Sequence, residues 1–255
     1  MDGLKDRVAL VTGGAAGIGR AIALKLAREG SHIAILDLDA DAAARTAEEV
    51  RQLGCRAAST GGNVADAGSV AAAVSELSRQ MGPFDILINN AGIARLGALL
   101  TMDEKDWTDT FNVNVTGTFN VSRAVVPDMV KRKRGAVVNL ASWLGKRAAP
   151  KFGSYAASKF AIIGFTQALA LEVAPHVRVN AVGPGLIVGT PMRDVIDTAS
   201  ARAGLPLAEE RAKSIPLGRA GTAEDVAKVV AFLASDEADY VTGAMYDVTG
   251  GSWMS

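Results

Sequence analysis

Short apolar runs that alternate with helical patterns constrain the fold more than any other feature of this sequence. The runs are apolar at successive positions, as strands buried on both faces of a parallel sheet are. The clearest are Arg7–Thr12, His32–Asp37, Phe84–Asn89, Ala136–Leu140 and Val177–Val182. The helical stretches between them are Gly17–Glu29, Ala40–Leu53, Ala67–Met81, Asp103–Lys131 and Ser154–Val173. This alternation predicts right-handed βαβ units in an α/β fold, with a doubly wound parallel sheet and helices on both faces.

The positions of glycines indicate helix ends, and the lack of a linker indicates a single domain. Gly30, Gly54, Gly82 and Gly135 each follow a helical stretch, where a left-handed C-cap favours glycine. No repeat, low-complexity segment or linker divides the 255 residues, so we predict a single domain over 1–255. The stretch rich in glycine and proline after the strand at 177–182 interrupts the alternation, and it predicts a lid-like insertion at about 184–220.

Composition argues against several classes of partner. The 27 basic and 27 acidic residues balance, so no net field favours nucleic acid or an anionic membrane. The basic run at 131–134 ends a predicted helix, where cations complement the helix dipole. Cys55 is the single cysteine, which fits a reducing compartment, and His32 and His176 lack metal-ligand spacing, so no metal is expected. Neither a signal peptide nor an apolar run of about 18 residues is present, so we expect a cytoplasmic protein without membrane spans.

A glycine-rich turn at 12–19 joins the first predicted strand to the first predicted helix. The turn contains Gly13, Gly17 and Gly19. These glycines would let the backbone turn tightly and approach a pyrophosphate at the helix N-terminus, as in a Rossmann fold. A P-loop is the rival interpretation, because Gly14 and Gly19 have its spacing. Its lysine and hydroxyl positions hold Arg20 and Ala21, however, so that interpretation fails.

An acidic residue ends the second predicted strand. Asp37 lies near the spacing of about 20 residues beyond the glycine turn that is expected for a ribose-binding carboxylate. A carboxylate there accepts hydrogen bonds from the adenosine 2′- and 3′-hydroxyls and repels a 2′-phosphate, while Leu38 adds no positive charge. The sequence therefore favours NAD over NADP. The plainer alternative is that Asp37 is a solvated strand end.

The segment from Ser142 to Lys159 carries acid–base chemistry. Ser142 follows the strand Ala136–Leu140, at the carboxyl end where open α/β sheets bind ligands. Tyr155 and Lys159 are four residues apart near the start of a helix, so they share one face. A phenol with its ordinary pKa near 10 is a poor base, but a neighbouring ammonium would lower that pKa. Each residue alone is common on ordinary helices, and the combination favours proton transfer coupled to hydride transfer.

Six motifs follow one another in a fixed order: Thr12-Gly-x-x-x-Gly17-x-Gly19, Asn89-Asn90-Ala91-Gly92, Asn114, Ser142, Tyr155-x-x-x-Lys159 and Pro184-Gly185. In this order and spacing the chain resembles the short-chain dehydrogenase/reductase family over essentially its whole length. The resemblance implies an NAD(P)-dependent enzyme that acts on CH–OH groups.

The same resemblance implies roles for individual residues. Tyr155 would be the general acid/base, and Ser142 would hydrogen-bond the substrate oxygen. Lys159 would bind the nicotinamide ribose and lower the pKa of Tyr155, and Asn114 would hold a proton relay behind Lys159 through its backbone and a water. Further cofactor contacts are expected at Ile18, Asn90, Ala91, Gly92, Pro184 and Gly185.

The chain departs from the family's pattern in two places. The position after the third strand, usually an aspartate beside the adenine, is Asn63, which is followed by the expected Val64. An amide can still bond the exocyclic amine, so both stay cofactor contacts. The segment 184–192 is one residue longer than the common form, and it still offers Ile187 and Thr190 as the expected carboxamide contacts.

The expected substrate wall mixes apolar and polar residues: Arg95, Ser142, Trp143, Leu144, Phe152, Leu186 and Met192. Arg95 either meets a substrate carboxylate or hydroxyl or lies on the surface, and Trp143 is either a pocket wall or simple packing. The tail at 246–255 is similar to those of bacterial sugar-alcohol dehydrogenases of the family. We therefore expect a secondary alcohol that is a polyol, a sugar or a hydroxy acid derived from one.

Two alternative functions and an oligomeric state are also considered from the resemblance to this family. A 3-oxoacyl-carrier-protein reductase shares the site but normally uses NADPH, against which Asp37 argues. A redox sensor that binds the dinucleotide without catalysis tends to lose the tyrosine or the lysine, and this chain keeps both. The family commonly forms tetramers through its two long helices, here Asp103–Lys131 and Ser154–Val173, so a homotetramer is expected.

Overall fold

One parallel sheet organises the protein. The computed structural model describes residues 1–202 and 204–253. Its strands lie in the order β3-β2-β1-β4-β5-β6-β7, and every neighbouring pair is parallel. They are β1 (Val8–Thr12), β2 (His32–Asp37), β3 (Ala57–Gly61), β4 (Ile86–Asn89), β5 (Gly135–Leu140), β6 (Val177–Pro184) and β7 (Met245–Val248). The predicted doubly wound Rossmann-type fold is confirmed.

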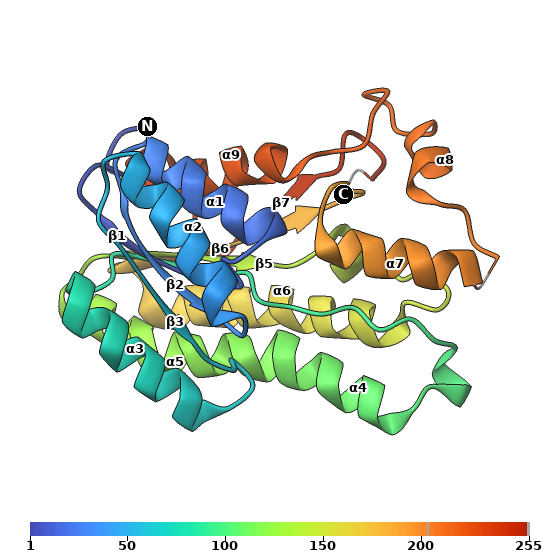
Figure 1. Ribbon diagram of the computed structural model, residues 1–255, viewed down its shortest axis with the longest axis horizontal. Coiled ribbons are helices and arrows are strands. Elements are labelled where there is room, and N and C mark those ends of the chain that lie inside the picture. The colour runs from blue at the N-terminus through green and yellow to red at the C-terminus, as the bar shows by residue number, and fades with distance from the viewer. Residues whose placement is uncertain (203, 254–255) are drawn as a thin grey trace.

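Helices cover both faces of the sheet (Figure 1). One face carries α1 (Gly17–Arg28), α2 (Ala40–Gln52) and α9 (Ala223–Ala234), and the other carries α3 (Ala67–Met81), α5 (Gly117–Lys131) and α6 (Gly153–Val173). Beyond the carboxyl ends of the strands lie α4 (Glu104–Phe111), α7 (Pro191–Arg202) and α8 (Ala208–Ala212). A separate apolar core fills each side of the sheet. The strand order reverses between β1 and β4, and a crevice at such a switch point is where open α/β sheets bind ligands.

The two edge strands, β3 and β7, are absent from the clear apolar runs of the sequence. β3 reads Ala-Ala-Ser-Thr-Gly and β7 reads Met-Tyr-Asp-Val, and both are only partly buried. An edge strand has a neighbour on one side only and needs less apolar surface. The five predicted strands all form, close to their expected bounds.

The stretch Asp103–Lys131 is not one regular helix as predicted. It comprises α4, a π-helical turn at Asn112–Thr116, and α5. Gly135 is also not a helix cap, because it is the first residue of β5, and Lys133 takes the left-handed conformation with φ of 57°. The other three glycines have positive φ, at 89°, 85° and 89° for Gly30, Gly54 and Gly82, but Gly82, with ψ of −173°, is not in the left-handed helical conformation.

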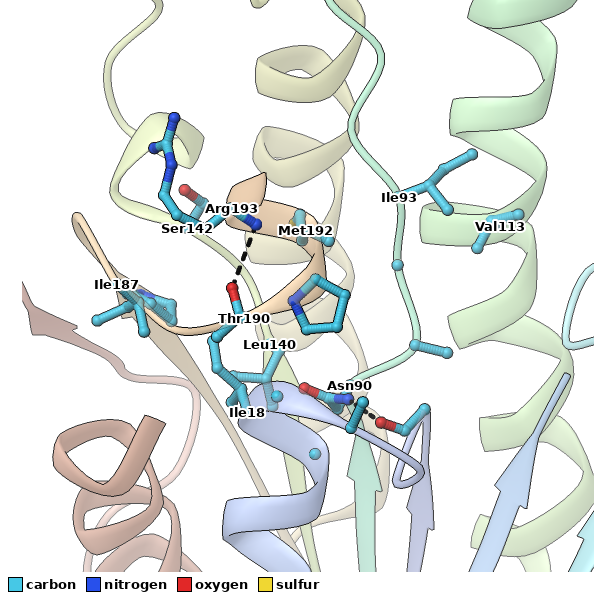
Figure 2. Close-up of a pocket in the computed structure, with 18 of the residues that line it drawn as sticks. Ile18, Asn90, Ile93, Val113, Leu140, Ser142, Ile187, Thr190, Met192 and Arg193 are labelled. Carbon is cyan, nitrogen blue, oxygen red and sulfur yellow. Dashed lines mark hydrogen bonds between the residues drawn. The ribbon is translucent and has the colours of Figure 1, made fainter. Parts of the chain in front are cut away.

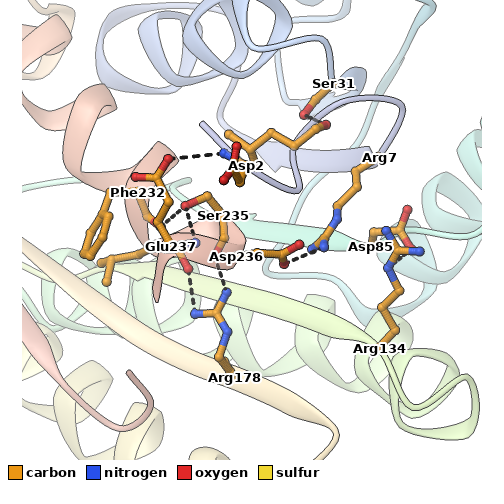
Figure 3. A network of polar contacts seen from close by, with 12 residues as sticks. Asp2, Arg7, Ser31, Asp85, Arg134, Arg178, Phe232, Ser235, Asp236 and Glu237 are labelled. Carbon is orange, nitrogen blue, oxygen red and sulfur yellow. Dashed lines mark hydrogen bonds and ion pairs between the residues drawn. The ribbon is translucent and has the colours of Figure 1, made fainter. Parts of the chain in front are cut away.

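Polar contacts tie together the amino ends of the strands (Figure 3). Arg7, just before β1, donates to Asp236 Oδ1 at 2.6 Å, beyond the end of α9. Arg178 of β6 donates to the carbonyls of Leu233 and Ser235 at 2.9 and 2.8 Å. Because these contacts lie at the amino ends, the carboxyl ends stay available for a site.

Helix α6 meets the length and composition requirements for crossing a membrane, although no membrane span was expected from the sequence. In the structure it packs against β6 and the turn Trp143–Gly145, and it carries the buried Tyr155 and Lys159. We therefore regard α6 as a core helix of the fold. Within 1–202 and 204–253, no three histidine, cysteine or acidic side chains gather into a possible metal site.

Candidate active site

A cavity of about 480 Å³ opens at the carboxyl ends of the strands. Its walls come from the segments after β1, β2, β3, β4, β5 and β6, from the first turns of α6 and α7, and from α8. Figure 2 shows it with Ile18 and Asn90 near one end and Met192 and Arg193 near the other. The sequence motifs that are far apart along the chain meet around this one cavity.

The glycine turn leaves bare backbone at the start of α1. Gly13 and Gly17 have φ of 63° and 53°, which disfavours any other residue. A Cβ on Gly19 would lie 2.0 Å from the carbonyl oxygen of Gly13. No side chain fits into this cradle, and the free N–H groups of a helix N-terminus attract an anion. The turn therefore fits a dinucleotide pyrophosphate.

Side-chain bonds hold the glycine turn against the segment after β4. The Thr12 hydroxyl accepts hydrogen bonds from the backbone N–H groups of Asn90 and Ala91, at 3.0 and 3.1 Å. The Asn90 amide donates to the carbonyls of Thr12 and Gly13, at 3.0 and 2.8 Å. These bonds fix the two loops on either side of the switch point, so Asn90, Ala91 and Gly92 line the cavity as expected.

Acidic and amide groups line the end of the cavity beyond β2 and β3. The Asp37 carboxylate accepts hydrogen bonds from the backbone N–H groups of Ala15 and Asp39, at 2.9 and 3.1 Å. Asn63 Oδ1 accepts from Ala65 N at 3.0 Å, and Asn63 and Val64 both line the cavity. Among the described residues that line the cavity, the basic ones are Lys159, Arg193 and Arg211, and none of them belongs to this end.

Ser142 and Tyr155 form the polar centre of the opposite end. Ser142 Oγ accepts a hydrogen bond from Leu144 N at 3.2 Å, which holds the serine in the turn after β5. Both residues are buried. Burial raises the pKa of the Tyr155 phenol because a phenolate loses its hydration there, and a hydrogen bond with Ser142 partly opposes that rise.

Lys159 lies one helical turn beyond Tyr155, with its ammonium 5.6 Å from the centre of the tyrosine ring. The ammonium donates to the carbonyl of Leu140 at 2.7 Å. Burial lowers the pKa of Lys159 to about 8. The expected lowering of the Tyr155 pKa by Lys159 is not seen in this structure, since burial dominates the phenol and the ammonium is engaged by Leu140.

Asn114 lies behind the cavity, in the π-helical turn. Its amide donates to Ile93 O and to Ser158 Oγ, both at 3.0 Å, and its Oδ1 accepts from Ile93 N at 2.8 Å. The extra backbone residue of a π turn re-aims a side chain, and such turns are frequent at functional sites. Asn114 thus braces the segment after β4 against α6, while the water relay expected through its backbone stays a prediction.

The expected substrate residues divide into two groups. Those that line the cavity are Ser142, Trp143, Leu144, Phe152, Leu186 and Met192. Arg95 is not among them, because its guanidinium turns to Asp106, with Nε 3.4 Å from Oδ1. The surface interpretation of Arg95 therefore holds in this structure, and Trp143 is a wall residue.

The segment after β6 also reaches the cavity. Pro184, Gly185, Ile187 and Thr190 line it, and Thr190 Oγ1 accepts from Arg193 N at 3.2 Å (Figure 2). Four lining residues of this lid-like segment were not predicted from the sequence: Pro191, Arg193, Ile196 and Arg211. Ile196 lies four residues after Met192 and three after Arg193 on α7, a spacing that could have pointed to Ile196 once the lid was predicted.

A comparison with protein families agrees with this geometry. The family model described as enoyl-(acyl carrier protein) reductase matches residues 13–252. The chain belongs to the short-chain dehydrogenase/reductase family. It is therefore an oxidoreductase of the type that acts on CH–OH or keto groups.

Relatives within the short-chain dehydrogenase/reductase family cover 96% to 100% of this chain. The 3-oxoacyl-(acyl-carrier-protein) reductase FabG of Staphylococcus aureus is 41% identical over 248 residues, 96% of this chain and 98% of that protein. The oxidoreductase UcpA of Salmonella typhimurium is 41% identical over 261 residues, 100% of this chain and 97% of that protein. The solved structure of NAD⁺-bound xylitol dehydrogenase is 33% identical with a TM-score of 0.93, and covers 98% of this chain and 100% of its own. Levodione reductase is 32% identical with a TM-score of 0.90, over 97% of each chain.

Proposed function

We propose that the protein is an NAD-dependent oxidoreductase that interconverts a secondary alcohol and a ketone with Tyr155 as acid/base. One observation carries the proposal. Ser142, Tyr155 and Lys159 meet at one end of a cavity whose other end holds a bare glycine turn and the carboxylate of Asp37. A dinucleotide bound at the glycine turn and a substrate bound beside Tyr155 would thus occupy the same cavity.

Each catalytic side chain has a distinct task in this proposal. Tyr155 takes the proton from the substrate hydroxyl, and Ser142 holds the substrate oxygen by a hydrogen bond. Lys159 holds the nicotinamide ribose, and its charge stabilises the phenolate. Asn114 keeps the segment after β4 and the start of α6 in register behind them. NAD, when bound, would supply the acceptor for the hydride.

The charge of the adenosine end supports NAD rather than NADP. Asp37 ends β2 beside the glycine turn, and Asp39 also lines the cavity there. A 2′-phosphate would meet carboxylates, whereas ribose hydroxyls would find an acceptor. The solved structure of a relative bound to NAD⁺, xylitol dehydrogenase, agrees with this preference.

The substrate that we propose is a polyol, a sugar or a hydroxy acid derived from one. The relation to xylitol dehydrogenase supports a polyol-like substrate. The first test is absorbance at 340 nm with NAD or NADP against polyols, sugars, hydroxy acids and simple secondary alcohols. NADH formation with one of the first three classes is expected, and turnover only with NADP would contradict the role of Asp37.

The identity to FabG supports a second candidate, reduction of a 3-oxoacyl-carrier-protein. Kinetic constants for NADH and NADPH with a 3-oxoacyl thioester decide between the two. A larger kcat/KM with this thioester and NADPH than with any alcohol and NAD would favour the reductase. Binding of NAD without turnover of any alcohol or thioester would favour the third candidate, a non-catalytic redox sensor.

Assembly and location complete the proposal. We propose a homotetramer built through α4, α5 and α6, because large apolar side chains are exposed on or beside these helices: Leu100, Trp107, Phe119, Phe160 and Leu171. The predicted single domain, with residues 184–220 as its lid, and a cytoplasmic location stay part of the proposal. The unpaired Cys55 fits a reducing compartment.

A further inference from the structure

Two arginines of the lid segment face the substrate end of the cavity. Arg193 lies in the first turn of α7 and Arg211 lies on α8, and both line the cavity with Ser142 and Tyr155. The proposed chemistry needs neither of them, because proton transfer and dinucleotide binding are assigned to other residues. The presence of two arginines in the cavity wall is therefore not explained by the proposed chemistry alone.

Arg193 is buried and incompletely paired. Only 8% of its surface is exposed, and its Nε has no hydrogen-bond partner among the described residues. One of its terminal nitrogens donates to Asp197 Oδ1 at 2.7 Å. An unsatisfied donor of a buried cation carries a large desolvation cost. A ligand that accepts this hydrogen bond would remove the cost.

Arg211 is half-buried, and its guanidinium has no hydrogen-bond or ion-pair partner within 1–202 and 204–253. Burial lowers the pKa of Arg211, the nearby charge of Arg193 lowers it further, and the carboxylate of Asp197 partly opposes both. Asp197 cancels one of the two positive charges, so the group of Arg193, Arg211 and Asp197 keeps one net positive charge. A single negative charge from a ligand would balance it.

The apolar neighbours place this charge beside the reacting groups. Ile196, three residues after Arg193 on α7, packs in one cluster with Tyr155, Phe152 and Leu144. Figure 2 shows Arg193 at the far end of the drawn pocket from Ile18 and Asn90, and thus away from the glycine turn expected to hold the pyrophosphate. An apolar surrounding strengthens a charge-assisted hydrogen bond.

We propose that the substrate carries a carboxylate and that Arg193 and Arg211 bind it, so the enzyme acts on a hydroxy acid and its keto acid. The inference rests on the proposed alcohol–ketone chemistry and narrows its substrate class. The planar fork of a guanidinium pairs with the two oxygens of a carboxylate. The single net charge of the arginine group matches a carboxylate better than a phosphate, which carries nearly two.

The test compares acids with neutral molecules of the same carbon skeleton. The pairs are lactate with 2-propanol, 3-hydroxybutyrate with 2-butanol, and gluconate with sorbitol, each with NAD and the full-length enzyme. Glycerol 3-phosphate with glycerol tests a phosphate as the anion. We expect kcat/KM to be at least tenfold higher for one carboxylate than for its neutral partner. A neutral alcohol or a phosphate as the best substrate would overturn the proposal.

Variants then assign the preference to the arginines. Arg211→Gln is the main variant because Arg211 is half-buried, and Arg193→Lys keeps a charge for Asp197. We expect Arg211→Gln to lose about tenfold to a hundredfold in kcat/KM for the carboxylate and less than threefold for its neutral partner. Lys213→Gln removes a charge from an exposed neighbour outside the cavity and is the matched control.

Binding measurements separate this inference from the proposed function. Calorimetry gives the Kd of NAD for each variant, and then the Kd of each carboxylate for the NAD-loaded protein. An unchanged Kd for NAD with a weakened Kd for the carboxylate in Arg211→Gln supports the inference even where no alcohol is turned over, in which case only the proposed function fails. A weakened Kd for NAD, or equal losses for acid and neutral partner, would overturn the inference.

Discussion

Tyr155 and Lys159 are two buried titratable groups whose pKa values move in opposite directions for one reason. Burial disfavours charge, so the pKa of the phenol rises and that of the amine falls to about 8. Before a ligand is bound, the site therefore favours the neutral phenol. A phenolate becomes accessible near neutral pH only when positive charge faces it, which is why we expect acid–base activity to depend on the bound state.

Removal of the Tyr155 hydroxyl tests the central role directly. Tyr155→Phe keeps the ring and its packing in the cluster with Phe152 and Ala156. We expect kcat to fall about 10²- to 10⁴-fold, because the proton-transfer group is lost. Steady-state rates at 340 nm and the Kd of NAD by calorimetry check this. The Kd should stay within about twofold, and an unchanged kcat would remove Tyr155 from the mechanism.

The buried amine of Lys159 makes stability depend on pH. Its pKa of about 8 lies below the ordinary 10.5, so between these values the unfolded chain binds more protons than the folded protein. The free energy of unfolding therefore rises with pH through this window, by on the order of 3 kcal/mol for the full difference, and the cost is fully present below about pH 8.

Lys159→Met removes this dependence. We expect wild type to gain stability relative to the variant, both ligand-free, as pH rises from about 8 to 10.5. Urea unfolding at several pH values measures the difference, and subtraction of the two proteins cancels the titration of other groups. A difference that stays constant across the window would show that the ammonium is not buried as the structure has it.

At the level of elements, the turn between β1 and α1 depends on the absence of side chains. A Cβ on Gly19 would lie 2.0 Å from Gly13 O and 2.5 Å from the amide nitrogen of Asn90. Gly19→Ala must therefore move the turn or the β4 segment. We expect at least a hundredfold weaker NAD binding by calorimetry and a lower midpoint of thermal unfolding.

Gly68→Ala is the matched control for that substitution. Gly68 is exposed in the first turn of α3, and a Cβ there would meet only Asp66 Oδ1, at 3.3 Å. Alanine is also the better helix former. NAD affinity should be unchanged in this variant. Equal effects of the two substitutions would mean that the glycine turn is not a cradle for the dinucleotide.

The segment from α4 to α5 shows a feature that the apolar periodicity of the sequence does not predict. Its apolar pattern predicts one long helix, and the π turn at Asn112–Thr116 leaves no distinct mark in that pattern. In this turn Asn114 is hydrogen-bonded to Ile93 and Ser158, which lie 21 and 44 residues away in the sequence. Such partners are known only once the chain has folded.

For the whole molecule, the exposed apolar side chains on or beside α4, α5 and α6 are the strongest sign of assembly. Phe160 and Leu171, 47% and 84% exposed, lie eleven residues apart on α6, and thus on one face. We expect light scattering at micromolar concentration to give the mass of a tetramer. Phe160→Glu should shift the mass toward dimer or monomer, because a charge would lose its hydration in the interface. A wild-type monomer would contradict the assembly.

Sequence alone determined the doubly wound parallel sheet, its five central strands and the identity of the motif residues. These features depend on local patterns, since buried parallel strands need continuous apolar runs, and tight turns need glycine. For this reason Gly13, Asp37, Ser142, Tyr155 and Lys159 were all predicted before any contact was known.

Tertiary structure alone decided the direction in which long polar side chains turn. The sequence left Arg95 either at the substrate or on the surface, and the contact with Asp106 turns its guanidinium away from the cavity, whereas Arg193 and Arg211 reach the cavity from the lid. Burial likewise raises the pKa of Tyr155, whereas the sequence predicted a lowering by Lys159. Long side chains and ionisable groups respond to every neighbour within several ångströms, and those neighbours are brought together only by the fold.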